Sequence, residues 1–263
     1  MNAIEIKFLS EIQTAAEIIR ASENTVVLTG AGISTPSGIP DFRSKECGLW
    51  TEFDPFEVAS LVSFRQNPEK FYKWIRPLAQ KISEAKPNPA HLILADLERN
   101  GCIEAIITQN IDGLHQRAGS QKVLEVHGSW KSLTCTACFE TFESTGFMRS
   151  FINAGNIPYC RFCGSVLKPD LILIGEQLPI KIWMKATYAS SSCDAMIIAG
   201  SSLEVYPVAG LPLQALDNNA KLIIINRSAT HLDQHAEIVI NDDVASVIPQ
   251  IVQHIRRDKS GIK

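Results

Sequence analysis

Short, strongly apolar segments that could each form one buried strand recur along the chain, and helix-compatible segments separate most of them. The strand-like segments are 25–29, 103–108, 122–126, 171–174, 195–200, 221–226 and 236–241. Apolar runs without polar alternation are typical of strands buried on both faces, which occur in parallel sheets covered by helices. The pattern therefore predicts an α/β fold with a parallel sheet and helices on both faces, including helices near 5–22, 88–99 and 243–257.

Composition and charge narrow the class of protein. The 263 residues, of which 45 % are hydrophobic and 20 % charged, suit one large domain with or without an insertion. The net charge of −3 gives no electrostatic case for nucleic acid. No apolar run approaches the roughly 20 residues that a membrane span needs, and acidic residues in 1–20 favour an amphipathic helix over a signal peptide. We therefore expect a cytoplasmic protein with no membrane partner and no direct nucleic-acid partner.

Polar residues and glycines follow nearly every predicted strand. They are Gly30-Ala31-Gly32, Thr108–Asp112, His127-Gly128, Gly175-Glu176, Gly200–Ser202, Asn226-Arg227 and Asn241–Asp243. In open parallel sheets, ligands bind in the crevice beyond the carboxyl ends of the strands. These residues are therefore predicted to assemble one site.

Two Cys-x-x-Cys pairs, Cys135/Cys138 and Cys160/Cys163, are separated by 21 residues. Four thiolates in two such turns favour a tetrahedral structural zinc site. An iron–sulfur cluster and four free cysteines are the alternatives. A catalytic zinc is disfavoured, because four protein ligands leave no open position. The segment 131–168 is predicted to be a small module that needs its metal to fold.

The glycine turn at residues 30–32 begins like the dinucleotide fingerprint G-x-G-x-x-G, but Thr35 stands at the place of the third glycine. No strand ending in an acidic residue follows about 20 residues later, as a standard dehydrogenase would require. The backbone amides of 31–35 could still bind a pyrophosphate. The loop beyond offers a carboxylate, an aromatic ring and a guanidinium in Asp41, Phe42 and Arg43.

Longer motifs occur in a consistent order: GAGISTPSGIPDFRS, TQNIDGLHQRAGS, VLEVHGS, KPDLILIGEQLP, GSSLEVYPVAGLP and INRS. With the two cysteine pairs, they make residues 10–257 resemble the sirtuins, which are NAD-dependent protein-lysine deacylases, and in particular the tail-less microbial type. The resemblance implies a Rossmann-like domain (1–43, 101–130 and 169–263), a mostly helical lobe (44–100) and an inserted zinc-ribbon module (131–168). It also implies NAD as co-substrate, structural zinc and acylated-lysine proteins or peptides as substrates.

The same resemblance implies roles for particular residues. His127 would be the general base that removes a proton from a ribose hydroxyl after nicotinamide has left, and imidazole suits that task near neutral pH. Asn110 would act beside it, facing the ribose. The residues implied to bind NAD are Gly30, Ala31, Gly32, Thr35, Asp41, Phe42, Arg43, Gln109, Asn110, Ile111, Asp112, Gly200, Ser201, Ser202, Asn226, Asp243 and Val244. No chemistry is assigned to His91, His115, His231, His235 or His254.

Departures from the family pattern fall in the acyl-lysine channel, where Ile172, Ile174 and Val205 are expected to contact the substrate. Ile172 stands for a valine and Ile174 for a phenylalanine, so the acyl preference is open. Sirtuins that remove succinyl groups carry Tyr-x-x-Arg, whereas here Ile75 takes the third position after Tyr72. The alternatives left open are an ADP-ribosyltransferase or NAD hydrolase on the same scaffold, and a non-catalytic NAD- and zinc-binding regulator. A hydride-transferring oxidoreductase is disfavoured by the missing third glycine.

Overall fold

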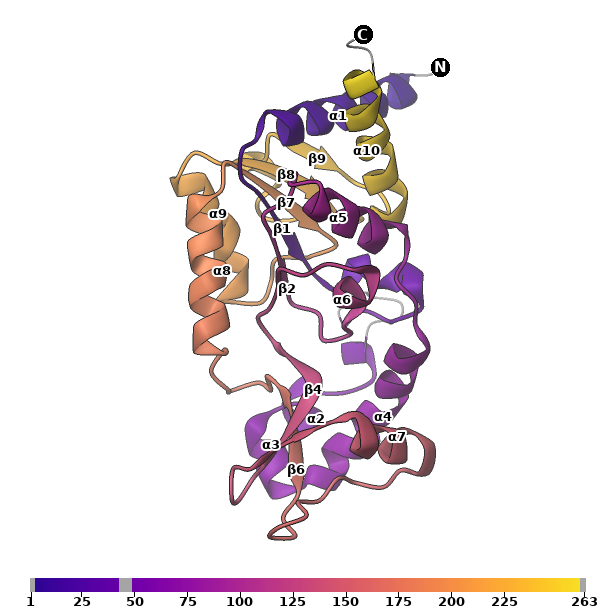
Figure 1. The fold of residues 1–263 in the computed structure, drawn as a ribbon, viewed down its shortest axis with the longest axis vertical. Helices are drawn as coiled ribbons and strands as arrows, with labels where there is room; N and C mark the ends of the chain where they lie inside the picture. The colour runs from indigo at the N-terminus through magenta and orange to yellow at the C-terminus, as the bar shows by residue number, and fades with distance from the viewer. Residues whose placement is uncertain (1–2, 43–48, 261–263) are drawn as a thin grey trace.

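The computed structural model describes residues 3–42 and 49–260, and its main body is a six-stranded, wholly parallel sheet. Figure 1 shows this sheet in the upper part of the molecule. The strand order is β3-β2-β1-β7-β8-β9. The bounds are β1 Thr25–Thr29, β2 Ala105–Thr108, β3 Val123–Glu125, β7 Ala195–Ala199, β8 Lys221–Ile225 and β9 Ile238–Ile240. The buried strands β1, β2 and β7 have no exposed residue, which is why their sequences lack polar alternation.

Helices cover both faces of this sheet, as the sequence predicts. One core cluster joins α1, α5 and α10 to the sheet, and α1 and α10 lie side by side in Figure 1. A second cluster joins α8 and α9 to the opposite face. The bounds are α1 Ala3–Ala21, α5 Pro89–Arg99, α6 Leu114–Ala118, α8 Ile180–Ser192, α9 Leu211–Asp217 and α10 Val244–Ser260. Within the described ranges, no helix has the length and apolarity to cross a membrane.

A smaller region lies at one end of the molecule and is built on a three-stranded antiparallel sheet of order β5-β4-β6. A third core cluster joins this sheet to α4 and α7. The bounds are β4 Gly128–Cys135, β5 Thr141–Glu143, β6 Leu167–Leu171, α2 Pro55–Val58, α3 Leu61–Gln66, α4 Pro68–Glu84 and α7 Thr145–Ala154. Single 3₁₀ turns are η1 Ala31–Ile33, η2 Thr35–Ser37, η3 Leu49–Thr51, η4 Val208–Gly210 and η5 Asp233–His235.

One predicted strand of the large sheet is wrong. Within 171–174, only Leu171 belongs to a strand, and that strand is β6 of the small antiparallel sheet. The segment 171–174 is apolar for another reason: Leu171 and Leu173 are buried, and all four residues line a cavity. The helix α5 also departs from expectation: it lies within 44–100, yet it packs against α10 on the large sheet.

Candidate functional site

The glycine turn after β1 lies against the end of β7. The amide of Gly30 donates to the oxygen of Ala199, and that of Gly32 donates to the oxygen of Gly200 at 2.8 Å. A Cβ atom added to Gly30 would lie 2.7 Å from the Gly200 oxygen, closer than real contacts allow. Two 3₁₀ turns follow instead of an α-helix, with Pro36 in the second of them. The glycines are therefore required by the close approach of two chain segments.

The segment after β2 is held against this turn. The Asn110 side chain donates to the oxygen of Gly30 at 2.9 Å and to the hydroxyl of Ser34 at 3.2 Å. The Ser34 hydroxyl in turn donates to the Asp112 carboxylate at 2.7 Å. Burial raises the pKa of Asp112, while hydrogen bonds from Leu114 and Ser34 act in the opposite direction. The carboxyl of Asp112 is thus held in one orientation inside the protein.

His127 follows β3 and is fixed by the end of β2. Its Nδ1 atom lies 3.1 Å from the backbone oxygen of Gln109. The Gln109 side chain donates to the hydroxyl of Ser201 at 2.9 Å, which links β2 to the end of β7. Three strand ends therefore place one imidazole, as the rule for parallel sheets predicts.

Two cavities meet at these residues. A polar cavity of about 750 Å³ extends over the glycine turn toward the ends of β7 and β8. An apolar cavity of about 790 Å³ extends the other way, toward α4. Among the described residues, six line both cavities: Ala31, Phe42, Gln109, Asn110, His127 and Val205. The junction of the two cavities is the place where two ligands could react with one another.

Most predicted site residues lie around this junction. The polar cavity is also lined by Gly30, Gly32, Thr35, Asp41, Gly200, Ser201, Ser202, Asn226 and Val244. The apolar cavity is also lined by Ile111, Asp112, Ile172 and Ile174. Asp243 lines neither cavity. Its carboxylate pairs with Arg227, which does line the polar cavity, and it accepts the amide of Ala245 at the start of α10. Arg43 lies outside the described residues.

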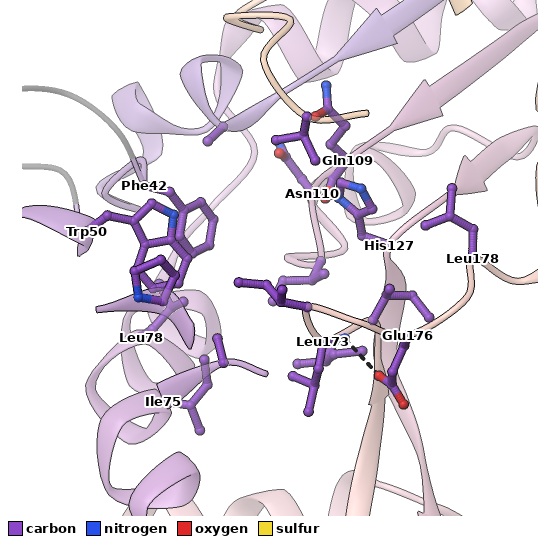
Figure 2. A pocket seen from close by; sticks show the side chains of 18 of the residues that line it. Phe42, Trp50, Ile75, Leu78, Gln109, Asn110, His127, Leu173, Glu176 and Leu178 are labelled. Atoms are coloured by element: carbon purple, nitrogen blue, oxygen red, sulfur yellow. Dashed lines mark hydrogen bonds between the residues drawn. The ribbon is translucent and has the colours of Figure 1, made fainter. Parts of the chain in front are cut away.

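Apart from Phe42, the wall of the apolar cavity opposite the strand ends was not predicted from the sequence. Figure 2 shows Phe42, Trp50, Ile75 and Leu78 on one side, and Leu173, Glu176 and Leu178 on the other. The rings of Phe42 and Trp50 lie 5.2 Å apart, and Trp50 stacks on Trp74 of α4 at 5.5 Å. The helical spacing of Trp74, Ile75 and Leu78 was the available signal, but such spacing is equally typical of core residues.

The loop after β6 forms the facing wall and is held by an ion pair. The Lys168 ammonium lies 3.1 Å from a Glu176 carboxylate oxygen, and both side chains are largely buried. The same oxygen accepts the Leu173 amide at 2.7 Å, which is the dashed line in Figure 2. This pair fixes the segment that carries Ile172 and Ile174.

The four predicted zinc ligands come together in the small region. The sulfur atoms of Cys135, Cys138, Cys160 and Cys163 all lie within 4.8 Å of one another. Pairs of them are separated by 3.4 to 3.7 Å. A tetrahedral zinc ion with bonds of about 2.3 Å places its sulfur ligands about 3.8 Å apart. The cluster therefore fits a structural zinc ion and leaves no ligand position open.

The chain matches the model of the Sir2 family over residues 30–207. It is 47 % identical over 251 residues to NAD-dependent protein deacylase 2 of Archaeoglobus fulgidus, which covers 95 % of this chain and 98 % of the relative.

Two similar solved structures contain bound ligands. Sir2Af2 bound to a myristoylated histone peptide superposes with a TM-score of 0.82 at 41 % identity, covering 95 % of this chain and 98 % of that one. A Sir2–p53 peptide–NAD⁺ complex superposes with a TM-score of 0.82 at 39 % identity, covering 94 % of this chain and 97 % of that one.

Proposed function

The chain belongs to the Sir2 family, and from that premise we infer that it is an NAD-dependent protein-lysine deacylase. The reaction consumes NAD and an acylated lysine, and it yields nicotinamide, free lysine and O-acyl-ADP-ribose. The observation that carries this function is the junction of the polar and apolar cavities at Gln109, Asn110 and His127. One cavity suits a dinucleotide and the other an acyl chain, so the reacting atoms of the two substrates would meet at this junction.

The polar cavity supplies the groups that would hold NAD. The backbone amides of the glycine turn would bind the pyrophosphate, because amide donors favour anions. Ser202, Asn226 and Val244 line its far end and would contact the adenosine. Asp243 would act there indirectly, by positioning Arg227 at the cavity wall. Ile111 and Asp112 would bind the nicotinamide carboxamide beyond the junction.

His127 is the proposed general base. Its Nδ1–H donates to a carbonyl oxygen, which can only accept, so the basic lone pair lies on Nε2. Bound NAD supplies the ribose whose hydroxyl loses a proton. Asn110 would help to orient that ribose, since its own side chain is fixed by Gly30 and Ser34.

The apolar cavity favours uncharged acyl groups longer than acetyl. In the part of the chain that the structure describes, no lysine or arginine lines it. Arg76 points elsewhere and donates to the oxygens of Ile152 and Asn153 at the end of α7. The Tyr72 hydroxyl donates to the oxygen of Leu167. A succinyl carboxylate would therefore enter this cavity without a partner, at a high desolvation cost.

Zinc would act structurally, by joining the two chain segments 135–138 and 160–163 that flank α7. We propose the division into a Rossmann-like domain, a helical lobe and the zinc module of 131–168, with α5 packed on the first of these. We also propose that the protein acts in the cytoplasm, since four thiolate ligands persist where thiols stay reduced.

The function is tested by incubating the protein with NAD and peptides that carry acetyl, butyryl, myristoyl or succinyl lysine. Mass spectrometry should show lysine unmasking that requires NAD, with myristoyl or butyryl preferred over succinyl. Nicotinamide release without any unmasking would instead identify an NAD hydrolase or an ADP-ribosyltransferase.

A further inference from the structure

Two buried histidines to which neither cavity gives a role lie behind the glycine turn. His91 is the third residue of α5, and His115 is the second residue of α6. Their side chains are 0 % and 1 % exposed, and their ring centroids lie 4.9 Å apart with the planes at 60°. Two buried histidines in contact cannot both be charged at low cost. The protonated nitrogen of each ring, and its hydrogen-bond partner, therefore have to be identified.

The protonation of His91 follows from its contacts. The backbone amide of Asn88 donates to its Nδ1 atom at 3.4 Å, so Nδ1 carries a lone pair. Burial, aided by the nearby Arg117, lowers the pKa of His91 to about 4, which makes the ring neutral at pH 7. The single ring proton therefore lies on Nε2. That buried atom has no hydrogen-bond partner in the described chain.

The protonation of His115 follows in the same way. Its Nε2 atom lies 3.0 Å from the hydroxyl oxygen of Thr29, and that hydroxyl donates its proton to Thr108 at 2.8 Å. The Thr29 oxygen must therefore accept from Nε2–H. Burial lowers the pKa of His115 to about 3, so the ring is neutral and its Nδ1 is a bare acceptor. This buried atom also has no hydrogen-bond partner among the described residues.

A buried donor without a partner thus lies on one ring and a buried acceptor without a partner on the ring beside it. Buried polar groups rarely stay unpaired, and ordered water commonly joins such groups. We propose that one buried water accepts from His91 Nε2–H and donates to His115 Nδ1, and that the resulting hydrogen-bond chain positions Asn110 for the reaction with NAD. Both histidines are positioning residues, because neither lines either cavity.

The completed chain runs in one direction from α5 to the site. It passes from the Asn88 amide through His91, the water, His115 and Thr29 to Thr108. The Thr108 hydroxyl oxygen also accepts the backbone amide of Asn110 at 3.1 Å. Each member holds the next in one orientation, and such chains stabilise one arrangement more strongly than isolated bonds.

A branch of the same network reaches the glycine turn. The Asn88 side chain donates to the oxygen of Ile33 at 2.7 Å and to the hydroxyl of Ser37 at 3.0 Å. The network therefore makes hydrogen bonds both to the segment after β2 and to the segment that follows β1. These are the two segments that Asn110 joins through its hydrogen bond to Gly30. Both segments line the polar cavity and the junction, so a change in the network should affect the use of NAD more than that of the acyl peptide. The proposal in this respect rests on the proposed function.

The first test uses the unaltered protein and does not depend on catalysis. Nitrogen-15 NMR of histidine-labelled protein at pH 7 should show His91 and His115 neutral, both protonated on Nε2. The Nδ1 resonance of His115 should have the shift of a hydrogen-bonded acceptor. A proton on His115 Nδ1, a charged ring or an Nδ1 shift typical of an unbonded nitrogen would overturn the proposal.

The second test separates positioning from simple structural support. His115→Phe and Thr108→Val, which remove the polar atoms at similar size, should lower kcat/KM for NAD by about tenfold or more, since small misplacements near reacting groups are costly. The KM for the acyl peptide should stay within about twofold. His115→Gln and Thr108→Ser keep polar atoms and should recover most of the loss, and the exposed His231→Phe should behave as the unaltered protein.

Equal losses in the conservative and non-conservative variants, or a loss confined to melting temperature, would contradict the positioning role. Calorimetric measurement of ADP-ribose affinity compares the conservative and non-conservative variants without requiring turnover. An unaltered protein that deacylates nothing would refute the proposed function, whereas the NMR and ADP-ribose results would still decide the histidine network.

Discussion

The Nδ1 atom of His127 lies 3.1 Å from the backbone oxygen of Gln109, so the end of β2 determines which nitrogen of this imidazole is basic. A carbonyl oxygen accepts but cannot donate, and the Nδ1 proton is therefore fixed before any substrate binds. The same backbone segment continues into Asn110, which holds the glycine turn. One strand end thus sets both the tautomer of the base and the position of its neighbour.

Replacing this imidazole tests its role as general base. His127→Ala should lower kcat for deacylation by about 10²–10⁴-fold, because no other group would remove the ribose proton. The zinc content should stay unchanged, since His127 lies at the junction of the two cavities and is not part of the cysteine cluster. The exposed His235→Ala is the matched control. Full turnover by His127→Ala, followed by nicotinamide release and peptide mass, would rule out the assignment.

Loss of one zinc ligand should unfold the small region. Cys135→Ala should remove the bound zinc and lower the free energy of unfolding by about 3–5 kcal/mol, as loss of a structural metal does. Zinc is measured by atomic emission and stability by thermal melting. Cys102→Ala, which lies outside the cluster, should change neither quantity. A Cys135→Ala protein with one zinc per chain and an unaltered melting temperature would show the zinc site to be elsewhere.

The acyl preference should depend on the uncharged wall of the apolar cavity. Ile75→Arg should lower kcat/KM for myristoyl lysine by about tenfold or more, because a charge would be buried beside the acyl chain. Acetyl lysine should be affected less, and Ile75→Leu should behave as the unaltered protein since it conserves volume. Competition between two peptides in one reaction measures the ratio directly. Faster removal of succinyl than of butyryl by the unaltered protein would refute the assigned preference.

The buried histidines should make the fold sensitive to acid. The folded-state pKa values of His91 and His115 are lowered to about 4 and about 3, whereas an unfolded histidine titrates near 6.5. The unfolded chain therefore binds protons first as pH falls. Stability is full above about pH 6.5 and is lost as pH falls toward the folded-state values, by about 2 kcal/mol per histidine between pH 7 and pH 5.

Urea unfolding at the two pH values checks this linkage. His91→Gln has no titrating group at that position and should lose about 2 kcal/mol less than the unaltered protein on acidification. Since both proteins share the zinc site and Asp112, their difference reports the histidine. An equal acid loss in both proteins would mean that His91 takes up its proton as readily in the folded as in the unfolded chain, which contradicts the lowered pKa.

Much of the fold was accessible from the sequence because parallel strands buried on both faces are apolar throughout. Six predicted strands form the large sheet, and its helices cover both faces. The prediction of a large-sheet strand at 171–174 failed because an apolar run does not show which surface buries it. Leu171 ends a strand of the other sheet, and Ile172 and Ile174 line a cavity.

The site residues also fall into a group that the sequence predicts and a group that it does not. Strand-end residues such as Gln109, Asn110 and Ser201 were predictable because parallel strands bring their carboxyl ends to one edge. Trp74 and Ile75 lie on a helix whose apolar face serves both the core and the cavity, so periodicity could not separate the two uses. The contact of His91 with His115 depends on the packing of α5 against α6, which no local pattern encodes.

The proposed function requires that the acyl group pass from lysine to ADP-ribose at the junction of the two cavities. A peptide whose lysine carries a carbon-13-labelled butyryl group, incubated briefly with NAD, tests this most directly. We expect one labelled O-acyl-ADP-ribose and one nicotinamide for each lysine unmasked. Labelled free butyrate as the first product, or unmasking without NAD, would contradict it.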